Sequence, residues 1–203
     1  NSKGRLTVAG LYTQSKGVAY QLNSDDAIMS ATAYDDGVFY VTSLDGFVYA
    51  MDEPKGVIDW QVSTGFGISQ PAIVLNNHVY VINSNNEMFK LIPESGKDAP
   101  GWEQPLENIG SYVGAGKDNM YVLDSVGDLC VIDQDSGAIL SKVEIGGIQS
   151  VLSNMISDRM YIVSDRGMIQ CLREINSRIP FFHSNELVEY EKNGGKTKED
   201  EVD

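Results

Sequence analysis

The fold is decided by the stretch Asp35-Asp36-Gly37-Val38-Phe39-Tyr40-Val41, which returns in altered form three more times along the chain. Its aromatic-aliphatic end recurs at intervals of 40, 41 and 40 residues, as Tyr80-Val81, Tyr121-Val122 and Tyr161-Ile162. A fixed period of this length is typical of repeat architectures, in which each copy is one supersecondary unit. This repeat organises most of the chain.

Two turn positions frame each aromatic-aliphatic pair. Polar clusters precede the pairs: Asp35-Asp36-Gly37, Asn76-Asn77, Lys117-Asp118-Asn119 and Ser157-Asp158-Arg159. A second turn position lies six residues after each Tyr and is filled by Gly46, Asn86, Gly127 and Gly167. Glycine and asparagine tolerate the positive φ of tight hairpins, so the sequence predicts a turn at both places.

Short apolar runs, without any helical stripe, lie between the turns. The first copy has four such runs of about five residues: Ile28–Ala33, Val38–Thr42, Phe47–Met51 and Val57–Val62. Runs rich in Val, Ile, Tyr and Phe that end at turn residues are typical of strands in hairpins. Four short strands in about 40 residues make one blade of a β-propeller. The sequence therefore predicts an all-β propeller with about four four-stranded blades.

Charge and composition exclude several classes of function. The chain of 203 residues is 42% hydrophobic and 22% charged, as in ordinary globular proteins. It carries 15 Lys+Arg against 29 Asp+Glu, a net charge of −14. Nucleic acid is a poor partner for such a surface, because its binding depends on cations that neutralise phosphates. The apolar runs are too short to span a bilayer, so no membrane insertion is expected.

A resemblance to a known family lies in Tyr49-Ala50-Met51-Asp52-Glu53-Pro54-Lys55-Gly56-Val57-Ile58-Asp59-Trp60. This stretch resembles the A-x-D-x-x-T-G-x-x-x-W signature of the pyrroloquinoline-quinone-type (PQQ-like) propeller repeats. The third copy keeps Val131–Gly137 but has Ser141 at the Trp position. The second copy has Pro93 for the Asp, keeps Ser95-Gly96 and carries the insertion Lys97–Pro100 before Trp102. The resemblance covers about residues 6 to 175.

The resemblance implies a structural role for the tryptophans, which in this family dock between neighbouring blades. Trp60 and Trp102 are expected there, and Tyr20 should do the same in front of the first full copy. Counting back from the fourth Tyr places Lys142 at this position, whereas the signature of the third copy places Ser141 there. A large ring that fills a gap between blades buries apolar area and so stabilises the stack.

The repeat sets the expected domain boundaries. Residues 1–184 form the propeller segment, with a partial blade at 1–22 and repeats at about 23–62, 63–104, 105–143 and 144–184. Val8–Thr13 aligns with Phe47–Asp52 and is expected to be the third strand of the partial blade. Residues 185–203 are acidic and poor in apolar side chains, which favours a solvated, flexible tail. The alternative for this tail is an acidic docking segment.

PQQ-like propellers usually close with seven or eight blades, more than this chain supplies. The chain is therefore expected to be the carboxy-terminal part of a longer propeller, and the alternative is closure with another chain. No secretory leader is recognisable at its start. The family resemblance implies a periplasmic or other extracytoplasmic location.

No pattern of residues in the sequence indicates a catalytic, cofactor-binding or metal-binding site. His78 and His183 lack neighbours at metal-ligand spacing, and Asp124–Asp128 is interpreted as a hairpin turn rather than a calcium loop. Catalytic, cofactor-binding and metal-binding residues are all predicted to be absent. Cys130 and Cys171 lie nine and ten residues after their repeat Tyr, hence on opposite sheet faces. They are predicted to be unbonded, buried thiols.

Two functions fit a PQQ-like propeller. The favoured one is a non-catalytic scaffold that binds a protein partner in the bacterial cell envelope and needs no cofactor. The alternative is part of a quinoprotein dehydrogenase with PQQ and calcium. Such enzymes hold PQQ between a Trp and a disulfide of adjacent cysteines, whereas the two cysteines here are 41 residues apart.

The partner is expected on the linkers that enter each first strand, because loops at one end of every blade converge on a rigid scaffold. We call this set the linker rim: Asn23–Ala27, Ser63–Gly67, Glu107–Gly110 and Glu144–Gly147. These linkers mix glycine, small polar residues and carboxylates and carry no cation. Phe66 and Ile68 are the side chains expected to contact the partner.

Overall fold

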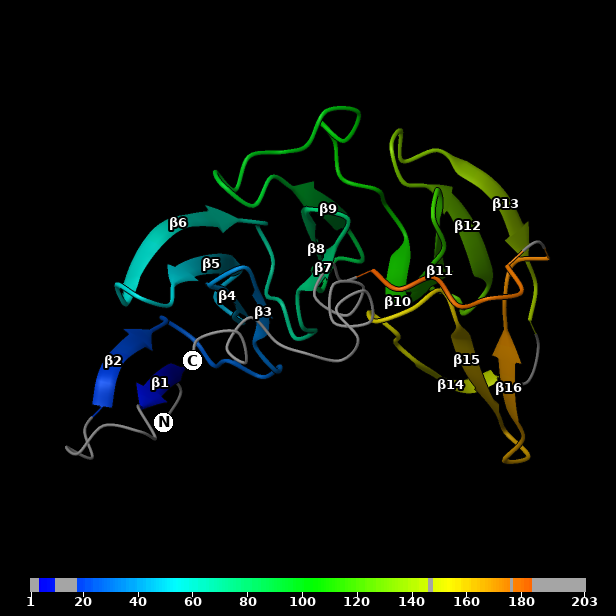
Figure 1. Ribbon diagram of the computed structural model, residues 1–203, viewed down its shortest axis with the longest axis horizontal. Coiled ribbons are helices and arrows are strands. Elements are labelled where there is room, and N and C mark those ends of the chain that lie inside the picture. Colours follow the sequence, from blue (N-terminus) through cyan, green and yellow to red (C-terminus); the bar gives the residue numbers. More distant parts are fainter. Residues whose placement is uncertain (1–3, 10–17, 146–147, 176, 184–203) are drawn as a thin grey trace, which may run out of the picture. The chain divides into compact units, whose positions relative to one another are not determined.

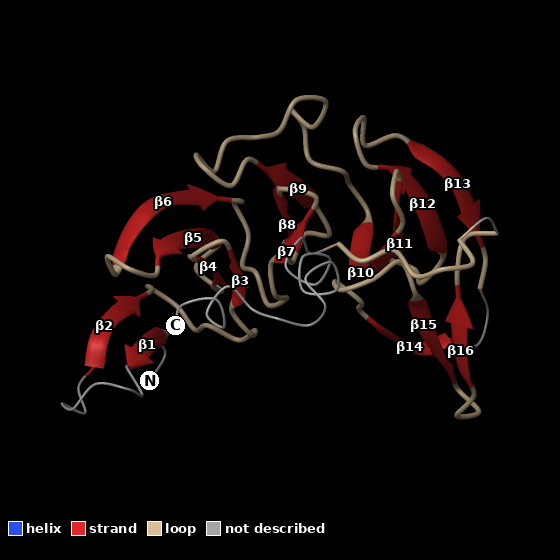
Figure 2. Ribbon diagram, viewed as in Figure 1, coloured by secondary structure: helices blue, strands red, loops and turns tan. Residues whose placement is uncertain are grey.

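The computed structural model describes residues 4–9, 18–145, 148–175 and 177–183. These residues form strands, turns and loops, and no helix occurs among them (Figure 2). No segment in the described part of the chain could therefore cross a membrane as a helix. The chain divides into two compact units, Asn1–Gly110 and Ser111–Asp203, each described by itself below.

Unit 1 contains three antiparallel sheets that follow one another in chain order (Figure 1). Each strand pairs with the next along the chain, as in an up-and-down blade. The first sheet has β1 (Arg5–Ala9) and β2 (Val18–Asn23). The second has β3 (Ala33–Asp35), β4 (Val38–Thr42), β5 (Phe47–Asp52) and β6 (Val57–Ser63). The third has β7 (Ile73–Leu75), β8 (His78–Ile82) and β9 (Met88–Leu91).

Unit 2 repeats the same connectivity in two sheets. The four-stranded sheet has β10 (Ile109–Ala115), which begins just before the unit boundary, β11 (Asn119–Asp124), β12 (Leu129–Asp133) and β13 (Ile139–Val143). The three-stranded sheet has β14 (Ile148–Leu152), β15 (Met160–Ser164) and β16 (Ile169–Leu172). The all-β propeller fold is thus confirmed, and each repeat Tyr lies in the second strand of its sheet.

Packing between sheets follows the two-residue period of the strands. Tyr40, Val48 and Ala50 face the third sheet and share a buried cluster with its residues, including Val79 and Val81. The alternating residues on the other face of the second sheet, such as Val41 and Met51, pack against the first sheet. Both faces of this sheet are therefore apolar, and each buried side chain contributes about 1.5–3 kcal/mol. The third and fourth repeats pack in the same way around Val113, Leu129 and Met160 in unit 2.

The turn after each second strand has the backbone that the sequence predicts. All four marker residues have positive φ: Gly46 at 86°, Asn86 at 59°, Gly127 at 94° and Gly167 at 77°. Polar side chains at the start of these turns hold the loop backbone. Asn83 Oδ1 accepts from the N–H groups of Asn85 and Glu87 at 3.0 and 3.1 Å, and Asp124 Oδ1 accepts in the same manner.

Two strands lie elsewhere than the sequence predicts. The first strand of the first copy is β3 at Ala33–Asp35 rather than Ile28–Ala33, because residues 27–32 form the linker. The third strand of the partial blade is β1 at Arg5–Ala9, since Arg5 pairs with Asn23 as Phe47 pairs with Ser63. The predicted run Val8–Thr13 was thus shifted by three residues, an odd number that reverses the two faces. Residues 10–13 of that run lie outside the described part.

Two sheets have three strands in the described part of the chain, where the sequence predicts four. In the second copy Pro93 and the insertion Lys97–Pro100 replace the fourth strand. Isolated bridges of β9 with Asp98 and Leu106, and a bond from Ala99 N to the Lys90 carbonyl, cover its outer edge. In the last copy no described strand pairs with the outer edge of β16. The predicted domain boundaries remain a proposal, and the acidic tail 185–203 lies outside the described residues.

Candidate functional site: the linker rim

The aromatic docking position is a contact between a ring and a glycine of the next blade. A Cβ added to Gly96 would lie 2.5 Å from the Trp60 ring, and one added to Gly56 would lie 2.4 Å from the Tyr20 ring. Both glycines also have positive φ, 66° and 65°. Trp60 Nε1 donates to the Pro93 carbonyl at 2.6 Å, which fixes the ring across the two sheets. The expected inter-blade role of Trp60 and Tyr20 is confirmed.

A bulge directs each docking side chain. The pairing register shifts between Ala50 and Met51 opposite β6, so that Trp60 pairs with Ala50 and Ile58 with Met51. The same shift precedes Tyr20 in the first sheet and Ser141 in the fourth. An extra residue in one strand twists the chain and re-aims the next side chain. Nothing in the apolar pattern of the sequence signals this bulge.

The bulge also decides between Lys142 and Ser141 in the third copy. Ser141 pairs with Val131, the counterpart of Ala50, so Ser141 occupies the docking position and the assignment of Lys142 to it was wrong. Lys142 instead lies 2.5 Å from Asp124 and 3.1 Å from Asp128. The hydrogen bonds that Lys142 donates to both carboxylates raise its pKa.

The described residues do not fit a PQQ site. Trp60 packs on Tyr40, with ring centroids 6.0 Å apart, and Trp102 packs edge-on against Tyr80 at 5.7 Å. Cys130 and Cys171 are both free, so the predicted lack of a bond is confirmed. Cys130 is buried as expected, but Cys171 is exposed, which corrects that part of the prediction. No cluster of His, Cys, Asp and Glu in the described part of the chain could hold a metal ion.

Backbone hydrogen bonds anchor the linker rim to neighbouring hairpin turns. Leu44 N donates to the Ala27 carbonyl at 2.9 Å, and Ser84 N donates to the Gly67 carbonyl at 2.8 Å. Thr64 N donates to the Gly46 carbonyl at 2.8 Å, and Thr64 Oγ1 donates to the Phe66 carbonyl at 2.9 Å. The first two linkers are therefore held rigidly on one end of unit 1. Within the linker Glu144–Gly147, residues 146–147 lie outside the described part.

Carboxylates on this end are tied into the turns. Asp45 accepts from the Tyr49 hydroxyl at 2.7 Å and from the N–H groups of Phe47 and Asp25 at 3.0 Å each. Burial and the bond to Asp45 raise the pKa of Tyr49, so its hydroxyl stays a donor. Asp26 Oδ1 accepts from Ala27 N at 2.7 Å. These bonds fix the positions of both carboxylates.

Three apolar side chains are exposed on this end, and of these the sequence reasoning named Phe66 but missed Met29 and Leu44. Phe66 is 50% exposed, Met29 65% and Leu44 36%. The Leu44 carbonyl lies beside Gly67, and Leu44 N bonds to Ala27, so these side chains belong to adjoining segments. Ile68, by contrast, is fully buried in the core cluster, and its expected contact with a partner is wrong. The spacing could have shown this, because Ile28, Ile68 and Ile109 all precede their repeat Tyr by twelve residues.

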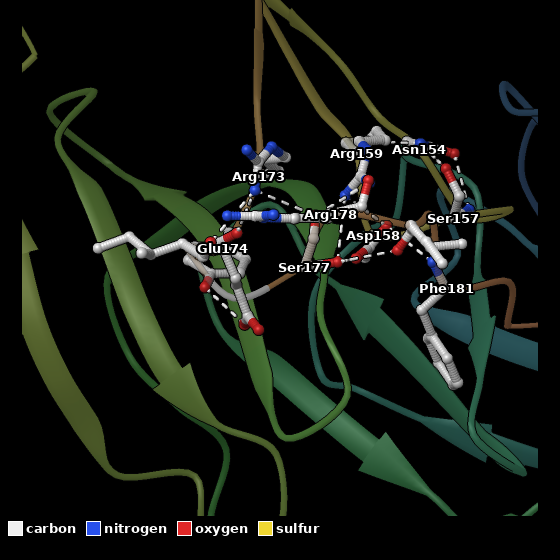
Figure 3. A network of polar contacts seen from close by, with 12 residues as sticks. Asn154, Ser157, Asp158, Arg159, Arg173, Glu174, Ser177, Arg178 and Phe181 are labelled. Carbon is white, nitrogen blue, oxygen red and sulfur yellow. Dashed lines mark hydrogen bonds and ion pairs between the residues drawn. The ribbon is translucent and has the colours of Figure 1, made fainter.

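A second polar cluster, unforeseen as a site, fills the turn before β15 (Figure 3). Asp158 and Arg159, predicted only as part of a polar turn, are 3% and 9% exposed. Arg159 Nη1 donates to Asp158 Oδ1 at 2.9 Å, and Arg159 Nη2 donates to the Ser177 carbonyl at 3.1 Å. Ser177 Oγ donates to the other oxygen of Asp158. This buried pair fixes residues 177–183 on the last sheet and is structural.

Two curated proteins named outer membrane protein assembly factor BamB are similar to the chain. That of Legionella pneumophila (strain Paris) is 23% identical over 185 residues, and that of Yersinia pestis is 24% identical over 202 residues. Each match covers 84% of this chain, but 46% and 50% of the relatives. The chain thus spans about half the length of the curated relatives it matches. No protein-family model matches the chain.

Solved structures share the fold. BamB from Moraxella catarrhalis has a TM-score of 0.64 at 18% identity, over 88% of this chain and 55% of that one. The propeller domain of Cps50 (Swd1) from Myceliophteria thermophila has a TM-score of 0.63 at 13% identity, over 81% and 57%. The low-identity relatives, the propeller fold and the docking contacts agree with the repeat signature. The comparisons thus support the resemblance of these repeats to the PQQ-like propeller type.

Proposed function

We propose that this chain is part of a non-catalytic propeller that binds proteins in the bacterial cell envelope and serves outer membrane protein assembly. The observation that carries this proposal is the exposure of Phe66, Met29 and Leu44 on rigidly held segments of one end of unit 1. Exposed aromatic and apolar side chains on a preorganised scaffold are typical anchors of protein interfaces. The two relatives named as assembly factors support the periplasm as the compartment.

The partner surface proposed is the part of the linker rim that lies in unit 1, Asn23–Ala27, Ser63–Gly67 and Glu107–Gly110, together with Met29 and Leu44. Its carboxylates, Asp25, Asp26 and Asp45, lie on the same segments as Met29 and Leu44 and favour a protein with complementary donors or cations. This composition suits a polypeptide better than a nucleic acid. We also propose that the remaining blades of a seven- or eight-bladed ring come from the same or another polypeptide, because a partial stack leaves apolar faces to be covered.

The proposal is tested by capture of envelope proteins on immobilised chain. The rim variant carries Met29→Ser and Phe66→Ser, and the matched control carries Tyr34→Ser and Val57→Ser at the other end of the same sheet. Tyr34 and Val57 are 53% and 49% exposed, so both pairs remove similar apolar surface. We expect the control to capture the same proteins as the unchanged chain and the rim variant to lose them. Equal capture by all three chains would remove the rim from consideration.

A further inference from the structure

The seven methionines of the chain fall into a buried and an exposed group. Four of them are at most 4% exposed: Met51, Met88, Met120 and Met160. The other three are Met29 at 65%, Met168 at 54% and Met155 at 36%. An exposed thioether meets a dissolved oxidant directly, whereas a buried one reacts only when the surrounding structure opens. Met29 is the most exposed of the seven, and it lies in unit 1 beside the linker rim.

The residues on both sides of Met29 are anchored, and this holds its side chain outward. Ile28 packs into the apolar cluster between the first two sheets. The Ser30 hydroxyl lies 2.6 Å from that of Thr42, and Thr42 donates to the Gln70 carbonyl at 2.8 Å, so Ser30 donates to Thr42. Met29 cannot turn its side chain into the core without breaking one of these contacts.

The repeat shows that the blades do not require an apolar residue at position 29. The places that precede the repeat Tyr by eleven residues in the other copies hold small residues: Ser69, Gly110 and Ser150. Leu44 has the counterparts Ser84, Ser125 and Asp165, and Phe66 has Asp26, Glu107 and Gly147. Apolar side chains that replace small or polar ones at equivalent exposed positions, and that gather on adjoining segments, indicate a contact surface.

Oxidation converts the Met29 side chain from an apolar group to a polar one. The thioether sulfur attacks one oxygen of a hydroperoxide, the O–O bond breaks and an S–O bond forms. The sulfur loses two electrons and the peroxide is reduced, so that hydrogen peroxide leaves as water. The sulfoxide accepts hydrogen bonds from water, and a partner that covers it must remove that water at a cost in free energy.

We propose that Met29 is an oxidation site for hydroperoxides and that its sulfoxide weakens the binding of a protein partner to the linker rim of unit 1. This inference rests on the proposed function, because it concerns the same surface. Methionine sulfoxide reductases restore the thioether, so the change in binding is reversible.

Two readouts on the full chain test the chemical step and its effect on binding separately. Hydrogen peroxide is the probe, and peptide mapping by mass spectrometry follows the sulfoxide at each methionine. We expect Met29 to be converted completely before the buried Met51 reacts measurably. Capture of envelope proteins by the immobilised chain is then compared before and after oxidation. Proteins that the Met29→Ser, Phe66→Ser rim variant loses should be captured about tenfold less, as for the loss of one interface anchor. Treatment with methionine sulfoxide reductases should restore their capture.

Two leucine variants assign the effect to one sulfur. Met29→Leu has no sulfur to oxidise at this position, so peroxide should not lower its capture below the level of the same variant untreated. Met168→Leu removes a similarly exposed methionine of unit 2, and its capture should stay as sensitive to peroxide as that of the unchanged chain. At a peroxide dose that leaves the buried methionines intact, the melting temperature should not change.

The outcomes distinguish this inference from the proposed function. If the untreated chain captures no protein that the rim variant loses, the proposed function fails, and this inference fails with it. If capture is specific but complete oxidation of Met29 leaves it undiminished, this inference alone is overturned. Equal peroxide sensitivity of Met29→Leu and the unchanged chain, or oxidation of Met29 no faster than that of Met51, would also overturn it. So would a lower melting temperature at that dose, because the lost capture would then report unfolding.

Discussion

Single residues determine the contact between blades, and two constraints require glycine at position 96. At Gly96 the backbone needs positive φ and the neighbouring ring leaves no space for a Cβ. The sequence signature placed this glycine and the aromatic residue correctly. It could not show that they touch, because a contact between residues 36 positions apart depends on the bulge that aims Trp60.

Gly96→Ala should therefore destabilise unit 1 by about 2–4 kcal/mol, from left-handed strain plus displacement of the Trp60 ring. Gly37→Ala is the matched control, because Gly37 has φ of 78° but nothing within 4 Å of an added Cβ. Gly37→Ala should lower the free energy of unfolding only by the backbone strain, about 1–2 kcal/mol. Urea denaturation followed by tryptophan fluorescence measures both. Equal losses would mean that the ring contact contributes nothing.

Phe66 and Ile68, the two side chains expected to contact a partner, should differ in how much their substitution lowers the free energy of unfolding. Ile68→Ser opens a cavity in the core cluster and should cost about 3 kcal/mol or more. Phe66→Ser removes a half-exposed ring and should change the free energy of unfolding by about 0.5 kcal/mol or less. Thermal denaturation of the two variants separates them. A large loss for Phe66→Ser would show that this ring belongs to the fold rather than to an interface.

At the scale of elements, regular turns were predictable and irregular ones were not. The turns at Gly46 and Gly167 follow from residue type, because few residues accept positive φ. The Ser157–Arg159 cluster has the same polar composition as its counterparts, yet Asp158 and Arg159 are buried. Their burial depends on residues 177–183, which the repeat does not describe. Composition alone cannot distinguish a solvated turn from a buried ion pair.

Asp158→Asn should destabilise unit 2 by about 3–5 kcal/mol, because it leaves the Arg159 guanidinium buried without its partner charge. Asp165→Asn, in an exposed turn of the same unit, serves as control and should change little. Chemical denaturation followed by circular dichroism gives the two free energies. A loss in Asp158→Asn no larger than in the control would contradict the structural role of the pair.

His183 gives unit 2 a dependence on pH. Burial lowers the pKa of His183 below its ordinary value of 6.5, with smaller opposing effects from the backbone of Ala115 and Ser157 and from Asp158. The unfolded chain then takes up a proton at higher pH than the folded one, so stability should fall as pH drops below about 6.5. His183→Gln should reduce this slope between pH 7.5 and 5.5 in denaturation curves. An unchanged slope would show that His183 is not its source.

At the scale of the whole molecule, the repeat period predicted the fold but did not predict the function. The 40-residue register predicted the second strands and the hairpins, because each blade is a local meander with its own turn signals. It missed the two sheets that have three strands in the described part of the chain, although Pro93 and the insertion Lys97–Pro100 mark the one in the second copy. It also missed two exposed apolar side chains beside the rim, because Met29 and Leu44 resemble core residues in the sequence.

The central claim is that one end of unit 1 binds proteins in the envelope, and photo-crosslinking at position 66 tests it most directly. A benzophenone amino acid replaces Phe66 in one chain and Tyr34 in the control, two similarly exposed positions at opposite ends of the sheet. After irradiation in envelope preparations, crosslinked proteins are identified by mass spectrometry. The account predicts crosslinks at position 66, enriched in outer membrane proteins or factors of their assembly, and few at position 34. Absence of crosslinks at position 66, or the same proteins at both positions, would contradict it.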